Sequence, residues 1–328
     1  MEKLLEIKDL YVNYNTDDSI VHALNGFSLD VYKGETLGLV GETGAGKTTA
    51  CLSTLRLLPS QVGQIVGGEI RYRDVDILKA SSEQMRQLRG NEIAMVFQDP
   101  MTSLNPIMTI GSQIKEVLDL HFRDMSERDK HARVDDILSL VGIAAGRKNQ
   151  YPHQFSGGMR QRVVIAMALV SEPKLILADE PTTALDVTIQ AQILALMKDL
   201  KVKFNSALLL VTHDLGVVAE FCDNVAVVYA GCVIEKGSIE QVFARSINHP
   251  YTQGLFNCIP ELTSTAERLA PIPGFMADPS NLPAGCKFAN RCERCQHKCL
   301  EAEPELHEVA PGHFIKCWTI SEEVGMNA

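Results

Sequence analysis

The stretch of sequence that decides the fold is Gly41-Glu42-Thr43-Gly44-Ala45-Gly46-Lys47-Thr48-Thr49. It fits a phosphate-loop pattern: a glycine, four residues, then Gly-Lys followed by Ser or Thr. An apolar run over residues 36–40 predicts a buried strand before the loop, and a helical pattern over 48–58 follows it. Glycines let such a loop turn tightly and aim its N–H groups at phosphate oxygens, and the helix N-terminus adds its positive dipole end. This placement predicts a site for a nucleoside triphosphate.

We expect different loop residues to have different roles in nucleotide binding. Lys47 can reach the β- and γ-phosphates, and Thr48 can hold Mg²⁺. The other nucleotide-binding positions that we expect in the loop are Gly41, Thr43, Gly44, Ala45, Gly46 and Thr49. A chance match in a glycine-rich loop is the alternative, and the strand and helix in the required places argue against it.

Length and charge limit the class of protein. The 328 residues can bury a sizeable core, and the net charge of −10 argues against a nucleic-acid-binding surface as the main function. No apolar run approaches the roughly 18 residues of a membrane-spanning helix, and the N-terminus lacks the basic-then-apolar layout of a secretion signal. We therefore expect a soluble, intracellular protein whose membrane contacts are made through partners.

Strand and helix patterns alternate along the chain. Apolar runs predict strands over residues 5–14, 67–72, 93–97, 175–178 and 207–212. Two more strands are expected on either side of Gly231, and helical spacing marks residues 107–150, interrupted by a polar stretch over 124–131. This alternation predicts an α/β fold with a largely parallel sheet. After about Pro250 the patterning fades and prolines become frequent, which predicts an irregular C-terminal segment.

Two carboxylates follow directly on the apolar run at residues 175–178. A strand end can deliver such groups to the edge of a phosphate loop. There Asp179 would support Mg²⁺ through water, and Glu180 would polarise the attacking water as a base. An acidic strand terminus facing solvent is the alternative.

Ser156-Gly157-Gly158 opens another helical run. The N–H groups at such a helix start can bind an anion. A glycine-rich turn with a serine cap is the alternative for this motif taken alone.

Over about residues 4–245 the chain resembles an ATP-binding-cassette (ABC) ATPase. The resemblance rests on the phosphate loop and, in the family's order, on Gln98, Phe155-Ser156-Gly157-Gly158-Met159, Asp179-Glu180, Ala184-Leu185-Asp186 and His213. It implies an ABC-type P-loop ATPase domain over 1–250, with a mixed-sheet core and a helical subdomain at about 100–170. A cysteine-rich C-terminal extension would occupy 251–328.

The resemblance also implies roles for single residues. Gln98 would sense Mg²⁺, which Thr48 and Asp179 would hold with it, and would couple to membrane subunits. His213 would contact the γ-phosphate, and Tyr14 matches the aromatic residue that stacks on adenine, with a core or surface tyrosine as the alternative.

The family further implies a head-to-tail dimer, in which Ser156, Gly157 and Gly158 of one subunit close on the γ-phosphate of the other and Asp186 lies at the seam. Most members read Leu-Ser-Gly-Gly-Gln, whereas this chain has Phe155 and Met159. The serine and the backbone donors survive both changes.

Five of the nine cysteines gather near the C-terminus: Cys286, Cys292, Cys295, Cys299 and Cys317. Four thiolates can complete an iron–sulfur cluster or a tetrahedral zinc site, and free reduced thiols are a third alternative. This cluster and residues 248–252 resemble the ATP-binding subunits of dipeptide and oligopeptide importers, and nickel importers share much of the pattern. In that group Cys286, Cys292, Cys299 and Cys317 can hold a [4Fe-4S] cluster, and the family spacing skips Cys295.

These observations predict the ATP-hydrolysing subunit of a peptide importer, peripheral on the inner face of the cell membrane. Its expected partners are two membrane permease subunits, a sister ATP-binding subunit and an extracytoplasmic binding protein, with no nucleic acid. The alternatives are a nickel importer subunit, a soluble cassette protein, and a redox or iron sensor whose cysteines gate the ATPase.

Overall fold

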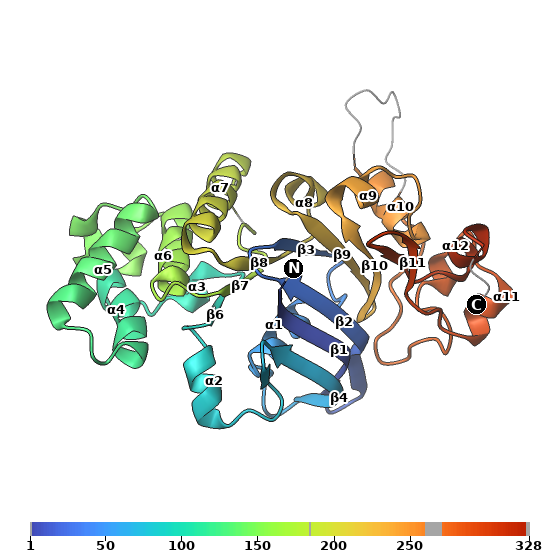
Figure 1. The fold of residues 1–328 in the computed structure, drawn as a ribbon, viewed down its shortest axis with the longest axis horizontal. Helices are drawn as coiled ribbons and strands as arrows, with labels where there is room; N and C mark the ends of the chain where they lie inside the picture. Colours follow the sequence, from blue (N-terminus) through green and yellow to red (C-terminus); the bar gives the residue numbers. More distant parts are fainter. Residues whose placement is uncertain (1, 184, 260–270, 326–328) are drawn as a thin grey trace. The chain divides into compact units, whose positions relative to one another are not determined.

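The computed structural model describes residues 2–183, 185–259 and 271–325, and the chain divides into two compact units (Figure 1). The first comprises Met1–Leu4, Val31–Thr36 and Lys79–Val211. The second comprises Leu5–Asp30, Leu37–Leu78 and Thr212–Ala328. Within the described ranges, none of the helices combines the length and the apolar character needed to cross a membrane.

Three parallel strands form the sheet of the first unit. They are β6 (Ile93–Val96), β7 (Leu175–Asp179) and β8 (Ala207–Thr212), with β7 in the middle. Every residue of β7 and β8 is buried, as expected for parallel strands covered on both faces. The register pairs Ile93 with Leu175 and Leu175 with Ala207, so all three strands end at the same edge of the sheet. These strands are confirmed at the predicted places.

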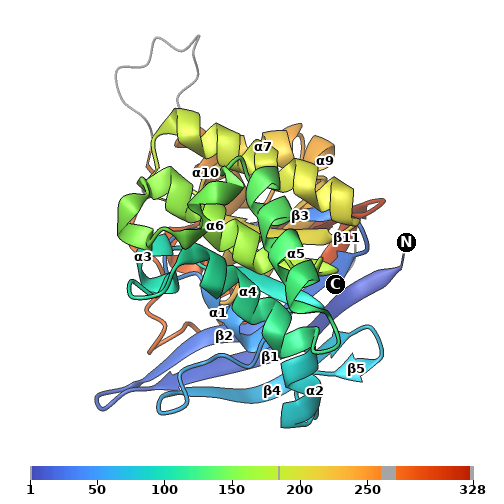
Figure 2. The same cartoon turned by 90° about the vertical axis from the view of Figure 1, so that its left-hand side faces the viewer.

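The helices of the first unit follow helical spacing in the sequence, and Figure 2 shows α4, α5 and α6 packed side by side. The helices are α2 (Ser82–Leu88), α3 (Pro100–Ser103), α4 (Ile110–His121), α5 (Glu127–Leu140), α6 (Gly157–Leu169) and α7 (Val187–Phe204), with 3₁₀ turns at Ala145–Asn149 and Pro152–Gln154. The interruption predicted over 124–131 is wrong in part, because α5 already begins at Glu127. The Ser126 hydroxyl accepts from the Asp129 N–H at 3.2 Å, and this cap lets a polar stretch start a helix.

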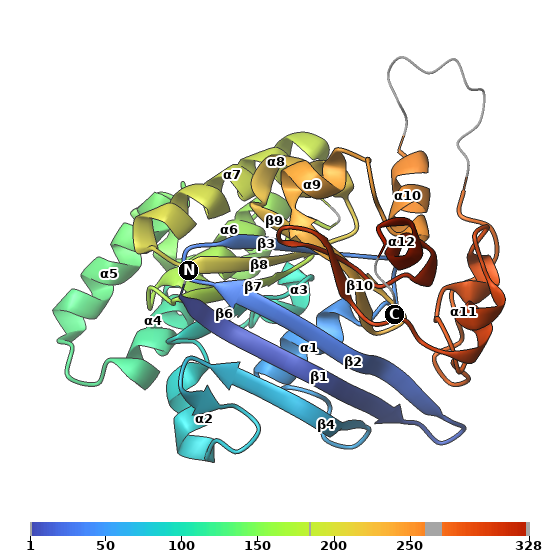
Figure 3. The same cartoon turned by 45° about the vertical axis from the view of Figure 1, so that its right-hand side comes forward.

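The second unit contains an antiparallel sheet in the order β2-β1-β4-β5, of which Figure 3 shows β2, β1 and β4 side by side. Its strands are β1 (Lys3–Asn15), β2 (Ile20–Tyr32), β4 (Gly63–Tyr72) and β5 (Val75–Asp76). In a second group, β3 (Thr36–Val40) runs parallel to β9 (Asn224–Tyr229), and β10 (Cys232–Ser238) is antiparallel to β9. The predicted pair of strands around Gly231 is confirmed. The expectation of a largely parallel sheet is wrong here, because a two-residue turn at Ala230-Gly231 joins only antiparallel strands.

The segment beyond residue 250 is more regular than predicted. It contains α10 (Pro250–Asn257), a 3₁₀ turn at Ala289–Arg291, α11 (His297–Glu301), β11 (His307–Ala310), β12 (His313–Ile315) and α12 (Trp318–Glu323). β12 pairs with β10, with Ile315 opposite Glu235, so this segment extends the sheet. The prediction of an irregular extension holds for 271–288, 292–296 and 302–306, and residues 260–270 lie outside the described residues. Elements this short give no measurable periodicity in the sequence.

A shared core joins this segment to the strands of the second unit. Tyr229 on β9 packs edge-on against Tyr251 of α10, with ring centroids 4.8 Å apart, and Phe288 lies 5.2 Å from Tyr229. All three side chains are buried. Such aromatic pairs contribute about 0.5–1.5 kcal/mol beyond the area that they bury. The remaining helices of this unit are α1 (Lys47–Thr54), α8 (Leu215–Phe221) and α9 (Ile239–Phe243).

Candidate active site

The phosphate loop connects β3 to α1 and depends on its glycines. Gly44 and Gly46 have φ angles of 83° and 102°, in the region that L side chains rarely adopt. A Cβ on Gly46 would lie 2.6 Å from the Ala23 carbonyl oxygen. Thr43, Gly44 and Thr48 are exposed, so a ligand can reach this side of the loop.

Lys47 is buried and folds over its own loop. Its Nζ donates to the carbonyl oxygens of Gly41 at 2.7 Å and Glu42 at 3.0 Å. These bonds hold the ammonium against the loop backbone, where a phosphate oxygen could take over as its partner.

Tyr14, near the end of β1, is fixed to the helix that follows the loop. Its hydroxyl and the Thr49 hydroxyl of α1 share a hydrogen bond of 3.2 Å. The structure thus links two predicted nucleotide-binding residues of the second unit, while stacking of adenine on the Tyr14 ring stays a prediction.

In the first unit, the parallel register brings Gln98 and Glu180 together. Gln98 follows β6 and Glu180 follows β7, and the Gln98 Nε2 donates to Glu180 Oε2 at 3.1 Å. The Thr183 hydroxyl donates to the same oxygen at 2.9 Å. Thr183 is absent from the predicted site, and its place three residues after the carboxylate is the only signal that could have found it.

The backbone around the two carboxylates is specialised. Asp179 is the last residue of β7 and is buried, whereas Glu180 is partly exposed. Glu180 has a φ of 45°, which is uncommon for a residue other than glycine and is a feature that recurs at active sites.

Ser156 stands at the N-terminus of α6 in the predicted position. It is exposed and makes no side-chain cap hydrogen bond, so capping does not occupy its hydroxyl. Gly158 lies against α7, where an added Cβ would be 2.7 Å from Ile189 Cγ2. The Asp186 carboxylate caps α7 by accepting from the Ile189 N–H at 2.9 Å. Ala184 lies outside the described residues.

The predicted nucleotide residues therefore fall into two sets, one in each unit. His213 is exposed directly after β8 and belongs to the second unit with Tyr14 and the phosphate loop. The first unit contributes Gln98, Ser156, Gly157, Gly158, Asp179, Glu180 and Asp186.

The predicted metal centre is not supported by this geometry. Cys286 and Cys299 pack with Trp318, and all the described cysteines are free thiols. Burial raises the pKa of Cys286 to about 12 and that of Cys292 to about 11, so both are protonated thiols in the metal-free protein. In the part of the chain that the structure describes, no group of three or more His, Cys, Asp or Glu side chains is placed to hold a metal ion.

His313 is buried. Its Nε2 lies 2.9 Å from Glu235 Oε1, and Glu235 also accepts from the Asn248 side chain at 2.7 Å and the His249 N–H at 2.9 Å. This buried cluster joins β10, β12 and the start of α10.

Comparison with protein families matches two parts of the chain. Residues 24–183 match the ABC transporter family, and residues 234–299 match the family described as oligopeptide/dipeptide transporter, C-terminal region. The first match covers the phosphate loop, Gln98 and Glu180, and the second covers Tyr251, Cys286 and Cys292.

Curated relatives match along nearly the whole chain. The probable peptide ABC transporter ATP-binding protein y4tR of Sinorhizobium fredii is 48% identical over 98% of this chain and 97% of its own length. The oligopeptide transport ATP-binding protein AppD of Bacillus subtilis is 45% identical over 98% of both chains. The dipeptide transport ATP-binding protein DppD of the same organism is 46% identical over 97% of this chain and 95% of its own.

Solved structures support the same assignment. The ATP-binding cassette MJ0796, in a dimeric post-hydrolysis state bound to ADP and Pi, has a TM-score of 0.64 and is 27% identical over 72% of this chain and 98% of that chain. CbiO1 of Clostridium perfringens, part of the ABC transporter complex cbiONQ, has a TM-score of 0.64 at 30% identity over 75% of this chain and 92% of that chain. The chain is an ABC ATPase and belongs to the ABC transporter ATP-binding proteins, in the branch that carries the oligopeptide/dipeptide transporter C-terminal region.

Proposed function

We propose that this chain is the ATP-hydrolysing subunit of an importer of di- or oligopeptides. The observation that carries the proposal is the full-length match to relatives named for peptide, oligopeptide and dipeptide transport, together with the C-terminal region of that branch. The same names disfavour a nickel importer and a soluble cassette protein.

The proposed nucleotide site uses the residues that the sequence predicts. The phosphate loop, from Gly41 to Thr49, cradles the phosphates, and Lys47 neutralises their charge. Mg²⁺ would be held by Thr48, Gln98 and Asp179, and it supplies charge stabilisation at the transferring phosphoryl group. The exposed Thr48 hydroxyl and the Gln98–Glu180 contact support these roles.

Hydrolysis in this scheme depends on positioning. Glu180 accepts a proton from the attacking water, and its carboxylate is oriented by the Gln98 amide and the Thr183 hydroxyl. His213 meets the γ-phosphate, and Tyr14 stacks on adenine. No covalent intermediate is required, because phosphoryl transfer is accelerated by alignment and by compensation of charge.

The working unit in this proposal contains two ATPase subunits on two permeases. Ser156, Gly157 and Gly158 bind the γ-phosphate held by the other subunit, and Asp186 lies at the seam. The exposed, uncapped Ser156 hydroxyl supports this role. We infer that the second ATPase subunit is a related sister chain and that an extracytoplasmic protein delivers the peptide. We also infer a location on the inner face of the cell membrane.

We further infer that residues 251–328 form an extension of the ATPase domain and that Cys286, Cys292, Cys299 and Cys317 carry a [4Fe-4S] cluster. The support is the cysteine spacing, which resembles that of the peptide-importer ATP-binding subunits.

Transport by a deletion strain tests the function. Cells that lack this chain should lose uptake of labelled di- or tripeptides and recover it with the wild-type protein, but not with Lys47→Ala. A tagged copy should co-purify with integral membrane permease subunits. Normal peptide uptake in the deletion strain, whether or not nickel uptake is lost, would reject the proposal.

A further inference from the structure

Glu42 is the residue of the phosphate loop that is not among the predicted phosphate contacts, and its carboxylate pairs with the C-terminal segment. The Arg291 Nη1 donates to Glu42 Oε2 at 2.7 Å, and its Nη2 donates to Glu42 Oε1 at 3.1 Å. Two parallel bonds of this kind form the fork-to-fork geometry that makes an arginine–carboxylate pair both strong and directional. The two residues are 249 positions apart in the chain.

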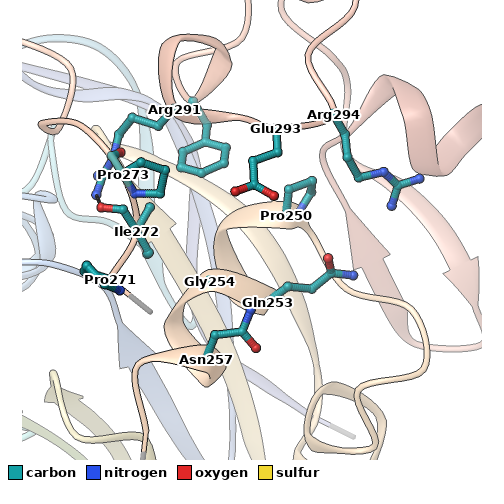
Figure 4. Close-up of a pocket in the computed structure, with 11 residues that line it drawn as sticks. Pro250, Gln253, Gly254, Asn257, Pro271, Ile272, Pro273, Arg291, Glu293 and Arg294 are labelled. Carbon is teal, nitrogen blue, oxygen red and sulfur yellow. Dashed lines mark hydrogen bonds between the residues drawn. The ribbon is translucent and has the colours of Figure 1, made fainter. Parts of the chain in front are cut away.

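Arg291 is itself held rigidly. Its Nε donates to the Pro273 carbonyl oxygen at 3.0 Å and its Nη2 to that of Ile272 at 3.4 Å. Its side chain is only 5% exposed, and the guanidinium lies 5.8 Å from the centre of the Tyr229 ring. Figure 4 shows Arg291 beside Ile272 and Pro273 at the edge of a cavity of about 150 Å³. An arginine fixed in this way can impose its own position on Glu42.

The backbone of Glu42 is anchored as well. Its N–H donates to the Tyr251 hydroxyl of α10 at 3.0 Å, and its carbonyl oxygen accepts from Lys47. A third contact comes from Met276, whose Cε lies 3.1 Å from the point that a Cβ on Gly44 would occupy. Three residues beyond position 250 therefore hold the loop at Glu42 and Gly44.

These contacts bear on nucleotide affinity for two reasons. A loop with positive φ at Gly44 and Gly46 has many alternative conformations, and holding it in one shape lowers the entropy lost on binding. A carboxylate in a loop that surrounds phosphates would also repel them, and Arg291 compensates that charge.

We propose that Arg291 is a positioning residue for the phosphate loop, and that through Glu42 it makes nucleotide affinity depend on the C-terminal segment. The proposal rests on the proposed role of the loop in ATP binding. It goes beyond that role because Arg291 lies outside the phosphate loop and acts on it through Glu42.

A double-mutant cycle on the full-length protein tests the proposal, with MgATP affinity measured by calorimetry. Because loss of Arg291 leaves the partly buried Glu42 carboxylate uncompensated and frees the loop, Arg291→Gln should weaken MgATP binding about 30-fold. Glu42→Gln should weaken it about fivefold, and the double variant should resemble Glu42→Gln rather than Arg291→Gln. In the ATPase assay, Arg291→Gln should raise KM and leave kcat within about threefold, as expected for lost ground-state binding.

The matched control is Arg294→Gln, because Arg294 lies in the same segment but pairs with Glu323. This variant should bind MgATP like the wild type. Arg291 could instead serve only to fold the segment through Pro273 and Ile272. In that case the double variant would bind MgATP as weakly as Arg291→Gln alone, and the proposal would be overturned. Thermal unfolding without nucleotide shows whether Arg291→Gln is folded. If it is not, Glu42→Gln alone decides, and unchanged MgATP affinity in that variant overturns the proposal.

Lys47→Ala distinguishes failure of this proposal from failure of the proposed ATP-binding role of the phosphate loop. If Lys47→Ala abolishes binding and Arg291→Gln binds within twofold of the wild type, the positioning role fails and the nucleotide site stands. If Lys47→Ala binds MgATP normally, the assignment of the loop itself fails.

Discussion

At the scale of the residue, Glu180 shows how a fold prepares a general base. Its positive φ turns the chain directly after β7, and two donors meet the same carboxylate oxygen from Gln98 and Thr183. Strain of this kind persists only where the surrounding structure fixes it. The carboxylate therefore has a defined direction before any water or nucleotide arrives.

Glu180→Gln should bind MgATP within about threefold of the wild type and lose turnover by about 10²–10⁴-fold. The amide keeps the size of the side chain but cannot accept a proton. Steady-state hydrolysis in the assembled transporter measures the loss, and Glu220→Gln, an exposed residue of α8, is the control. Hydrolysis within a few-fold of the wild type would remove Glu180 from the mechanism.

His249 is a residue-scale source of pH dependence. Burial lowers its pKa to about 3, and its Nδ1 accepts the Tyr251 N–H at 3.0 Å, so the folded ring is neutral. Above about pH 6.5 the ring is neutral in the folded and unfolded states alike. Below that pH the unfolded chain binds a proton that the folded chain refuses, so the free energy of unfolding should fall by about 1 kcal/mol per pH unit towards pH 4.

Thermal unfolding between pH 7.5 and 5 tests this against His249→Asn, which keeps an acceptor at the start of α10. The free energy of unfolding of the wild type should fall towards that of the variant as the pH falls. His297→Asn, at a side chain that is 84% exposed, should follow the wild type. Parallel curves for the wild type and His249→Asn would show that the folded protein does not lower the pKa of His249.

At the scale of the element, the sequence predicts what is long or fully buried and misses what is short. β3, β7 and β8 are continuous apolar runs, so all three were predicted. β12 has three residues and α11 has five, too few for a period to emerge. The start of α5 was missed because a cap at Ser126, rather than apolar spacing, defines it.

Some contacts within the site could likewise be expected from the sequence, and others could not. Gln98 and Glu180 could be expected to lie close together because both follow parallel strands, although the sequence does not reveal that β6 neighbours β7. The pair of Glu42 and Arg291 could not be foreseen. Nothing local marks either residue, and their meeting depends on how α10 and the segment around Pro273 return to the loop.

At the scale of the whole molecule, the proposed partner contacts predict a weak enzyme when the chain is alone. Ser156, Gly157 and Gly158 are proposed to serve the nucleotide of another subunit, so the purified chain should be monomeric and hydrolyse ATP slowly. Light scattering and hydrolysis at several protein concentrations measure both. Ser156→Arg should fold, because Ser156 is exposed and caps nothing through its side chain, but should not gain activity with concentration. A tight nucleotide-free homodimer, fully active at nanomolar protein, would contradict this arrangement.

The last prediction concerns the thiols of the C-terminal segment. Anaerobically purified protein should be brown and contain about four iron and four sulfide per chain, held by Cys286, Cys292, Cys299 and Cys317. Because burial raises the pKa of Cys286 to about 12 and that of Cys292 to about 11, ligation must displace protons from these thiols. Reconstitution of metal-free protein should therefore be more complete at pH 8.5 than at pH 6.5.

Two cysteine variants fix the ligands. Cys292→Ser should lose iron and loosen residues 271–325 in hydrogen exchange, because a metal centre contributes folding free energy to a segment whose helices and strands are short. Cys295→Ser should keep the full iron content, since Cys295 is exposed and stands outside the family spacing. One zinc and no iron in protein made under iron-replete, oxygen-free conditions would overturn the cluster, and loss of iron from Cys295→Ser would overturn the choice of ligands.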